Sequence, residues 1–222
     1  MTAQSFRWHG LALQARCAGS LWWPEGRWLI VADLHLGKSE RMARRGGALL
    51  PPYEGLATLE RLRAEIEATD PAVVISPGDG FDDDAAAGDL DVTHCAILHD
   101  LARGREWIWL AGNHDPGAAP CDHLPGRMAV QARLGPAVLR HEAVLGDGPD
   151  ISGHYHPAVR IAGRRARAFL IGADHLILPA FGAYTGGLDA QQPRLAALTA
   201  GGIAIACLHR AIALPLQTRA AG

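Results

Sequence analysis

Continuous apolar runs alternate with helical patterns in the first half of the chain. The runs at 28–32, 73–75 and 107–111 are short and uninterrupted, which predicts buried strands. Between them, apolar residues recur at the spacing of one helical face over 53–68, and a second helix is predicted over 91–103. The first half is therefore expected to run strand–helix–strand–helix–strand.

In the second half the helical periodicity fades, and short apolar segments separated by turns take its place. They predict strands at 127–133, 136–140, 159–162, 167–172, 175–178 and 203–208. An opening hairpin is expected from 6–13 and 16–22. Together these elements predict an α/β fold of two packed mixed sheets flanked by helices, a four-layer α-β-β-α sandwich.

The composition is that of an ordinary globular protein, and the 222 residues suit a single domain covering 1–222. No apolar run approaches the length of a membrane span, and the first residues lack the apolar region of a signal peptide. The four cysteines are widely spaced without a Cys-x-x-Cys pair, which predicts free thiols and a reducing cytoplasm. They are Cys17, Cys95, Cys121 and Cys207.

The net charge says little about whether the protein binds nucleic acid. A net charge of −2 excludes a strongly basic protein that coats DNA, but not an enzyme that grips a few phosphates. Among the 21 basic residues only Lys38 is a lysine. Either a coding bias or selection for phosphate-binding guanidinium groups would explain this excess of arginine.

Polar fragments of one chemical kind follow several of the apolar runs. Side chains that follow parallel strands meet beyond the carboxyl ends of those strands, so these fragments are expected to gather at one edge. Carboxylate, imidazole and amide oxygen together suit a pair of divalent cations. Taken singly, each fragment is also compatible with an ordinary turn or a structural histidine. The fragments are Asp33-Leu34-His35, Gly78-Asp79, Gly112-Asn113-His114-Asp115, His141 and Gly153-His154-Tyr155-His156.

The spacing within the fragments suggests roles. Asp33 and His35 are two apart, as are His154 and His156, so each pair is expected to share one face of an extended segment. Asp79 can offer two oxygens to two metals. His114, with Asp115 to orient its ring, is placed to donate a proton to a leaving oxygen. The acidic run Asp82-Asp83-Asp84 is predicted to be a solvated approach to a helix, or its cap.

The order of these fragments resembles the signature of the calcineurin-like metallophosphoesterases. The segments 29–38 and 178–189, which contain DLHLGK and AFGAYTGGLD, resemble one bacterial branch, the ligase-associated DNA damage response endonuclease family PdeM. The resemblance covers roughly residues 6 to 208. It implies functional association with a DNA ligase, an MBL-fold exonuclease and an Lhr-type helicase.

The same resemblance implies a site and an activity. Asp33, His35 and His156 would hold one metal, and Asn113, His141 and His154 the second. Asp79 would bridge them, and His114 would be the acid. The ions would be manganese, with iron, zinc or magnesium as alternatives, and the substrate single-stranded DNA cut internally. In one departure, Gly80-Phe81-Asp82-Asp83 stands where that family has Ser-Phe-His-Asp.

Two arginine clusters and one aromatic segment are candidates for DNA contact. The alternatives are surface arginine from coding bias and aromatic side chains that pack a loop. The candidates are Arg41, Arg44, Arg45, Arg164, Arg165, Arg167, Phe181 and Tyr184. Two rival functions stay open. One is a phosphodiesterase or phosphatase on small nucleotides or other phosphoesters. The other is a non-catalytic scaffold, although scaffolds tend to lose ligands and here every position is filled.

Overall fold

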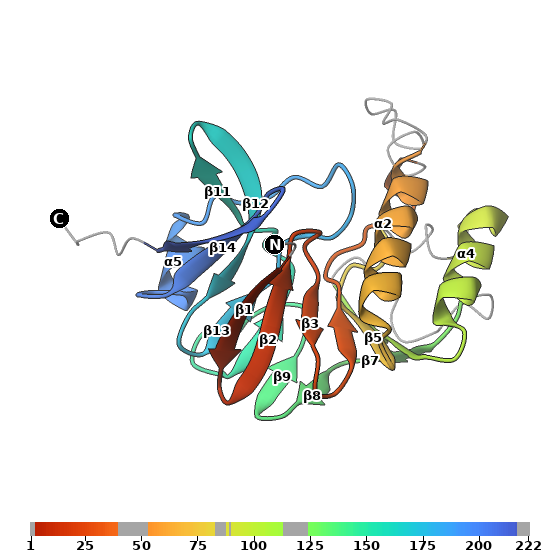
Figure 1. The fold of residues 1–222 in the computed structure, drawn as a ribbon, viewed down its shortest axis with the longest axis horizontal. Helices are drawn as coiled ribbons and strands as arrows, with labels where there is room; N and C mark the ends of the chain where they lie inside the picture. Colours follow the sequence, from red (N-terminus) through yellow and green to blue (C-terminus); the bar gives the residue numbers. More distant parts are fainter. Residues whose placement is uncertain (1–2, 40–52, 83–87, 89, 113–123, 217–222) are drawn as a thin grey trace.

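The computed structural model describes residues 3–39, 53–82, 88, 90–112 and 124–216, which form two packed mixed sheets with helices outside them (Figure 1). The first sheet is antiparallel from β1 to β4 and parallel from β4 to β7. Its strands, in spatial order, are β1 (Ala3–Trp8), β2 (Leu11–Arg16), β3 (Leu21–Trp23), β4 (Trp28–Ile30), β5 (Val73–Pro77), β6 (Glu106–Leu110) and β7 (Arg127–Ala129).

The second sheet runs in the order β15-β14-β12-β13-β10-β9-β8, and β11 pairs with β12 beside it. Neighbours β9, β10 and β13 are parallel, and the other pairs are antiparallel. Its strands are β8 (Ala132–Leu134), β9 (Ala137–Leu139), β10 (Asp150–Ser152), β11 (Ala158–Ile161), β12 (Arg164–Ile171), β13 (His175–Ile177), β14 (Ile203–Cys207) and β15 (Ala211–Pro215).

Helices α2 (Glu54–Thr69) and α4 (Val92–Ala102) lie on one side of the sheets, and α5 (Pro193–Leu198) lies on the other (Figure 1). Leu59 and Leu62, on one face of α2, are fully buried in a cluster with Val74 of β5. Asp91 caps α4 by accepting a hydrogen bond from the Thr93 amide. The structure therefore confirms the predicted fold class, and both predicted helices.

A single apolar core joins the two sheets. Ile30 and Ile75 of the first sheet share it with Leu139, Ile151 and Phe169 of the second, all nearly inaccessible to solvent. Burial of this kind stabilises the fold by roughly 25 cal/mol per Å² of apolar surface removed from water. The core fixes the two sheets against each other, so loops leaving their strands are held in a defined register.

The opening hairpin differs from the prediction. Segments 6–13 and 16–22 were expected to pair, which is wrong: β1 pairs with β2, and β3 then adds to β2. The turn falls at His9-Gly10, where both residues have positive φ values of 45° and 82°. A two-residue turn with left-handed residues matches the twist of adjoining strands, so it sets the register.

Among the described residues, no helix is both long enough and apolar enough to cross a membrane.

Candidate metal centre

Asp33, His35 and His156 come together as a first group, with ligand atoms all within 4.8 Å of one another. His35 Nε2 lies 3.2 Å from His156 Nε2, which in turn lies 3.5 Å from Asp33 Oδ2. Asp33 and His35 follow β4 of the first sheet, and His156 follows β10 of the second. The group therefore spans the seam between the two sheets.

Asp79, His141 and His154 form a second group of the same chemistry, also with ligand atoms within 4.8 Å. His154 Nδ1 lies 2.9 Å from His141 Nε2, and His141 Nε2 lies 3.7 Å from Asp79 Oδ2. These residues follow β5, β9 and β10. Each group thus offers one carboxylate and two imidazoles.

The two groups adjoin. Asp33 Oδ1 lies 3.7 Å from His141 Nδ1, and Asp33 Oδ2 accepts a hydrogen bond of 2.8 Å from the His154 amide. The Asp79 carbonyl accepts a hydrogen bond of 3.0 Å from the His35 amide. The Asp33 carboxylate therefore contacts both groups, and the backbone of Asp79 joins the second group to the first, so the two groups make up one centre.

Left-handed backbone is concentrated at this centre. Among the described residues, the candidate ligands with positive φ are Asp33 (52°), His35 (48°), Asp79 (37°), His154 (69°) and His156 (47°). Such conformations cost residues other than glycine roughly 1–3 kcal/mol each and persist where the surroundings impose them. Because the backbone is not extended, the prediction that His154 and His156 share one face is wrong, and they serve different groups.

The glycines of the motifs make room for ligands from other segments. A Cβ on Gly78 would lie 1.8 Å from His141 Nδ1, and one on Gly112 would lie 2.4 Å from Asp79 Oδ1. A Cβ on Gly153 would lie 2.4 Å from Asp33 Oδ2. Glycine therefore occurs in these motifs because a candidate ligand from another chain segment lies where its side chain would be.

Replacing Gly153 by alanine should distort the centre, because the added methyl group overlaps the Asp33 carboxylate. We expect a loss of about 1–3 kcal/mol in the free energy of unfolding and weaker metal binding. Thermal denaturation and calorimetric metal titration measure both. Gly88→Ala is the control, since a Cβ there meets nothing within 4 Å. Equal behaviour of the two variants would contradict the steric explanation.

Asp82 departs from the sequence-based prediction. It was expected in a solvated acidic run, which is wrong for this residue: only 2% of its surface is exposed, and Oδ1 lies 2.9 Å from His35 Nδ1. The Asp82 amide donates to the Leu36 carbonyl, which aligns the two segments. A carboxylate on the far nitrogen of a ligating histidine fixes the tautomer and orientation of its ring. Asp83 and Asp84 lie outside the described residues.

Glu142 lies near His154 but beyond hydrogen-bonding distance of its ring. Its Oε1 lies 3.9 Å from His154 Nε2, while His154 Nδ1 faces His141. The carboxylate accepts a hydrogen bond of 2.8 Å from the Tyr155 hydroxyl and pairs with Arg194. Burial, together with Glu142, raises the pKa of Tyr155 to about 12, so the phenol stays a donor. The sequence pointed to Glu142 only through its position directly after His141, and nothing in the sequence pointed to Arg194.

The donor set fits a pair of divalent cations. Burial, with the nearby charges of His35 and Lys38, lowers the pKa of His156 from 6.5 to about 3. Burial also lowers the pKa of His141 to about 4, although Asp79 acts in the opposite direction. Both rings are therefore neutral at physiological pH, the form in which imidazole binds metal. Carboxylate and imidazole together suit manganese, iron or zinc.

These lowered pKa values predict acid sensitivity of the metal-free protein. Between about pH 4 and 6.5 the unfolded chain binds protons at His141 and His156 that the folded chain does not, so protonation favours unfolding. We expect Tm to fall as the pH is lowered from 7 to 4, with a shallower slope in His156→Asn. The exposed His209→Asn should keep the slope of the unmodified chain. A flat Tm over this range would contradict the prediction.

Several predicted site residues cannot be placed. Asn113, His114 and Asp115 lie outside the described residues, as do Arg41, Arg44 and Arg45. The motif that holds the first three begins at Gly112, which the structure places against Asp79.

The remaining candidates for DNA contact divide into exposed side chains and side chains directed into the protein. Arg164 and Arg165 are exposed on β12, whereas Arg167 is directed inward, donating to the carbonyls of Ala180 and Phe181. Phe181 is fully buried and therefore packs the core. Tyr184 is 60% exposed.

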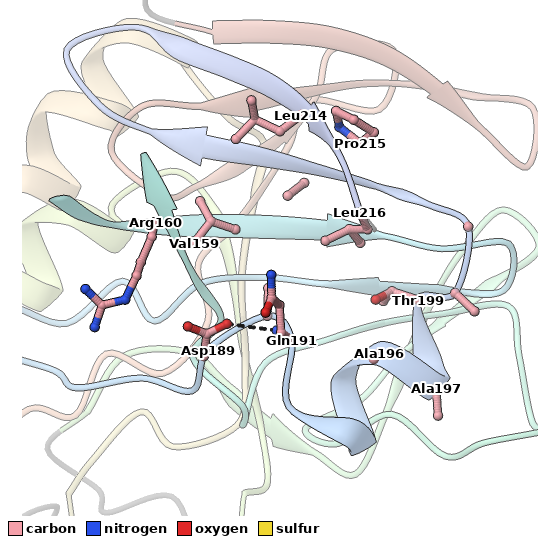
Figure 2. A pocket seen from close by; sticks show the side chains of 14 residues that line it. Val159, Arg160, Asp189, Gln191, Ala196, Ala197, Thr199, Leu214, Pro215 and Leu216 are labelled. Atoms are coloured by element: carbon pink, nitrogen blue, oxygen red, sulfur yellow. Dashed lines mark hydrogen bonds between the residues drawn. The ribbon is translucent and has the colours of Figure 1, made fainter. Parts of the chain in front are cut away.

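A separate hollow of about 630 Å³ lies beside α5, lined by β11, β14, β15 and the segment from Asp189 to Gln191 (Figure 2). Its lining is mostly apolar, with Arg160 and Asp189 at one side, and Asp189 accepts a hydrogen bond from the Gln191 amide. None of the described metal-ligand candidates lines it. The hollow is therefore separate from the two ligand groups.

The chain belongs to the calcineurin-like phosphoesterase family, which it matches over residues 26–162. Family membership makes it a phosphoesterase-type hydrolase. Among solved structures it is similar to the nuclease MPE of Pseudomonas putida, with 27% sequence identity and a TM-score of 0.75. The similarity covers 96% of this chain and 100% of that chain. No curated protein matches the chain significantly.

Proposed function

We propose that this protein is a manganese-dependent phosphodiesterase that uses two metal ions to cut single-stranded DNA internally during bacterial DNA repair. The observation that carries the proposal is the pair of adjoining groups, each with one carboxylate and two imidazoles. The family match supports phosphoester hydrolysis, and the similarity to a nuclease supports a nucleic-acid substrate. The PdeM-like segments 29–38 and 178–189 favour single-stranded DNA.

Each residue has a defined task in this proposal. Asp33, His35 and His156 would hold one ion, His141, His154 and Asn113 would hold the other, and Asp79 would be shared between them. When bound, two divalent ions would lower the pKa of water and neutralise charge on phosphoryl oxygens. Asp82, whose Oδ1 lies 2.9 Å from His35 Nδ1, would keep the ring of His35 in its ligating orientation.

His114 acts as the general acid in this scheme. Its protonated ring would donate a proton to the sugar oxygen that leaves the phosphorus and so return to neutral imidazole, and Asp115 would orient the ring. Proton donation of this kind is worth roughly 10²–10⁴-fold in rate. Its effect is greatest for an alkoxide, which is a poor leaving group without a proton.

Arginines that follow the ligand motifs in sequence hold the DNA backbone in this scheme. Arg41, Arg44 and Arg45 follow the first ligand motif in sequence, and Arg164 and Arg165 lie on the β11–β12 hairpin that follows His156. Contacts with phosphates position a strand without selecting its sequence and weaken as salt rises.

The cellular context is part of the same proposal. Cooperation with a DNA ligase, an MBL-fold exonuclease and an Lhr-type helicase would place internal cuts within a repair sequence. A cytoplasmic location agrees with Cys17, Cys95 and Cys207, which form no disulfide in the described part of the chain.

Circular single-stranded DNA tests this proposal because it has no ends. We expect the manganese-loaded protein to convert circles to linear products, and to cut them with a higher kcat/KM than small nucleotide phosphodiesters. A preference for the small esters, with circles left intact, would instead favour the alternative of a nucleotide phosphodiesterase. Protein stripped of metal by a chelator is the control.

A further inference from the structure

The loop 182–187 is fastened at both ends to segments that carry ligands of the first group. The Gly182 amide donates to the Asp33 carbonyl at 3.0 Å, and a Cβ on Gly182 would lie 2.4 Å from the Leu34 carbonyl oxygen. At the other end, a Cβ on Gly187 would lie 2.0 Å from the carbonyl oxygen of His156. The loop therefore lies against the first ligand group, and both of its ends need glycine.

Two further contacts hold the loop in place. The Ala183 amide donates to Thr58 Oγ1 of α2 at 2.9 Å, and the Arg165 guanidinium donates to the Gly187 carbonyl. Side-chain anchors at both ends restrict the conformations of a short loop, so whatever it displays is presented in a fixed position.

Tyr184 is displayed by this loop in an unfavourable backbone conformation. Its φ is 53°, in the left-handed region that glycine and asparagine tolerate best, yet its side chain is 60% exposed. A ring so exposed gains little from packing, so burial does not offset the strain. Among the described residues, five candidate metal ligands share this left-handed backbone. Backbone strain of this kind clusters at functional sites.

Positive charge borders the same loop. Arg160 and Arg165 lie directly opposite each other across β11 and β12, so both side chains leave one face of the hairpin. Both residues are exposed, and Figure 2 shows Arg160 extending from β11. Like charges in this position repel, and a passing polyanion would relieve the repulsion.

We propose that Tyr184 stacks on the base of a nucleotide next to the scissile phosphate. This inference rests on the proposed function. Tyr184 is two residues from Gly182, so its Cα lies within about 8 Å of a residue that contacts the first ligand group. Aromatic side chains stack on unpaired bases whatever their sequence, whereas bases within a duplex are already stacked. Tyr184 therefore favours single strands over duplexes and over simple phosphoesters.

Two substitutions separate the ring from the backbone. Tyr184→Asn removes the ring and leaves a residue suited to positive φ, while Tyr184→Phe keeps the ring and loses only the hydroxyl. Both variants should retain the metal content and Tm of the unmodified protein. The substrates are an oligothymidylate and an oligomer of equal length whose residues are abasic.

We expect Tyr184→Asn to lower kcat/KM on oligothymidylate roughly 10- to 100-fold, the range that base stacking on an aromatic side chain supports. On the abasic oligomer the same variant should change kcat/KM by less than about twofold, and Tyr184→Phe should resemble the unmodified chain on both. An equal loss on both substrates, or no loss on either, would overturn the stacking role while nuclease activity stands. Failure of the unmodified chain to cut either oligomer would overturn the proposed function itself, and the stacking role with it.

Discussion

Replacing Asp79 by alanine is expected to abolish metal binding in both groups and to lower phosphodiesterase activity by roughly 10³-fold or more. Asp79 is 3% exposed, and its Oδ2 lies 3.7 Å from His141 Nε2 in the second group. Its carbonyl accepts the amide of His35 from the first group. A carboxylate shared by two cations compensates the charge of both, so its loss weakens both sites.

Elemental analysis of the purified variant gives the number of bound ions per chain. Asp174→Ala is the matched control, because it removes an exposed carboxylate that lies outside both groups. The control should keep both ions and full activity. If Asp79→Ala kept two ions, or lost only the ion of the second group, Asp79 would not be shared.

Replacing His114 by alanine should separate catalysis from metal binding. The variant is expected to keep both ions but to lose roughly 10²–10⁴-fold in rate on a substrate whose leaving group is a sugar alkoxide. On a phosphodiester that releases p-nitrophenolate the loss should be small, because that anion leaves without a proton. The difference between the two substrates therefore measures acid catalysis.

The two substrates serve as controls for each other, since misfolding would reduce both rates alike. Metal content is measured on the same samples. A parallel loss of bound metal would show that His114 is a ligand, and an equal loss on both substrates would contradict its role as an acid.

Much of the fold could be predicted from apolar periodicity. The recurrence of apolar residues on one helical face predicted α2, and the uninterrupted apolar runs predicted β4, β5 and β6. The sequence analysis missed β10 and α5, which are short, and also β15, although β15 has as many residues as β5. The misplaced hairpin has a different cause, because a left-handed His9 sets the turn and residue type predicts this only weakly.

The centre was predictable as a set of residues but not as a geometry. Motif chemistry selected candidate ligands that the structure places in two groups, and the family resemblance assigned His154 and His156 to different groups, as the structure does. The alternation of side chains along an extended strand placed both histidines on one face instead. That rule assumes an extended backbone, which the left-handed φ values of these residues exclude.

Asp82 shows the complementary limit of sequence patterns. Because Asp82 lies within a run of aspartates, the sequence indicated a solvated segment. Its burial instead follows from a bridge between Leu36 and Phe81, a long-range contact that local sequence does not reveal. The exposed ring of Tyr184 was a candidate from sequence, but its strained backbone and the anchors of its loop became visible only in three dimensions.

Anomalous X-ray diffraction from crystals grown with Mn²⁺ tests the central claim most directly, because it locates each ion independently of activity. We predict two anomalous peaks, one among Asp33, His35 and His156 and the other among Asp79, His141 and His154. A peak at only one group, or at neither, would contradict a centre built for two metals.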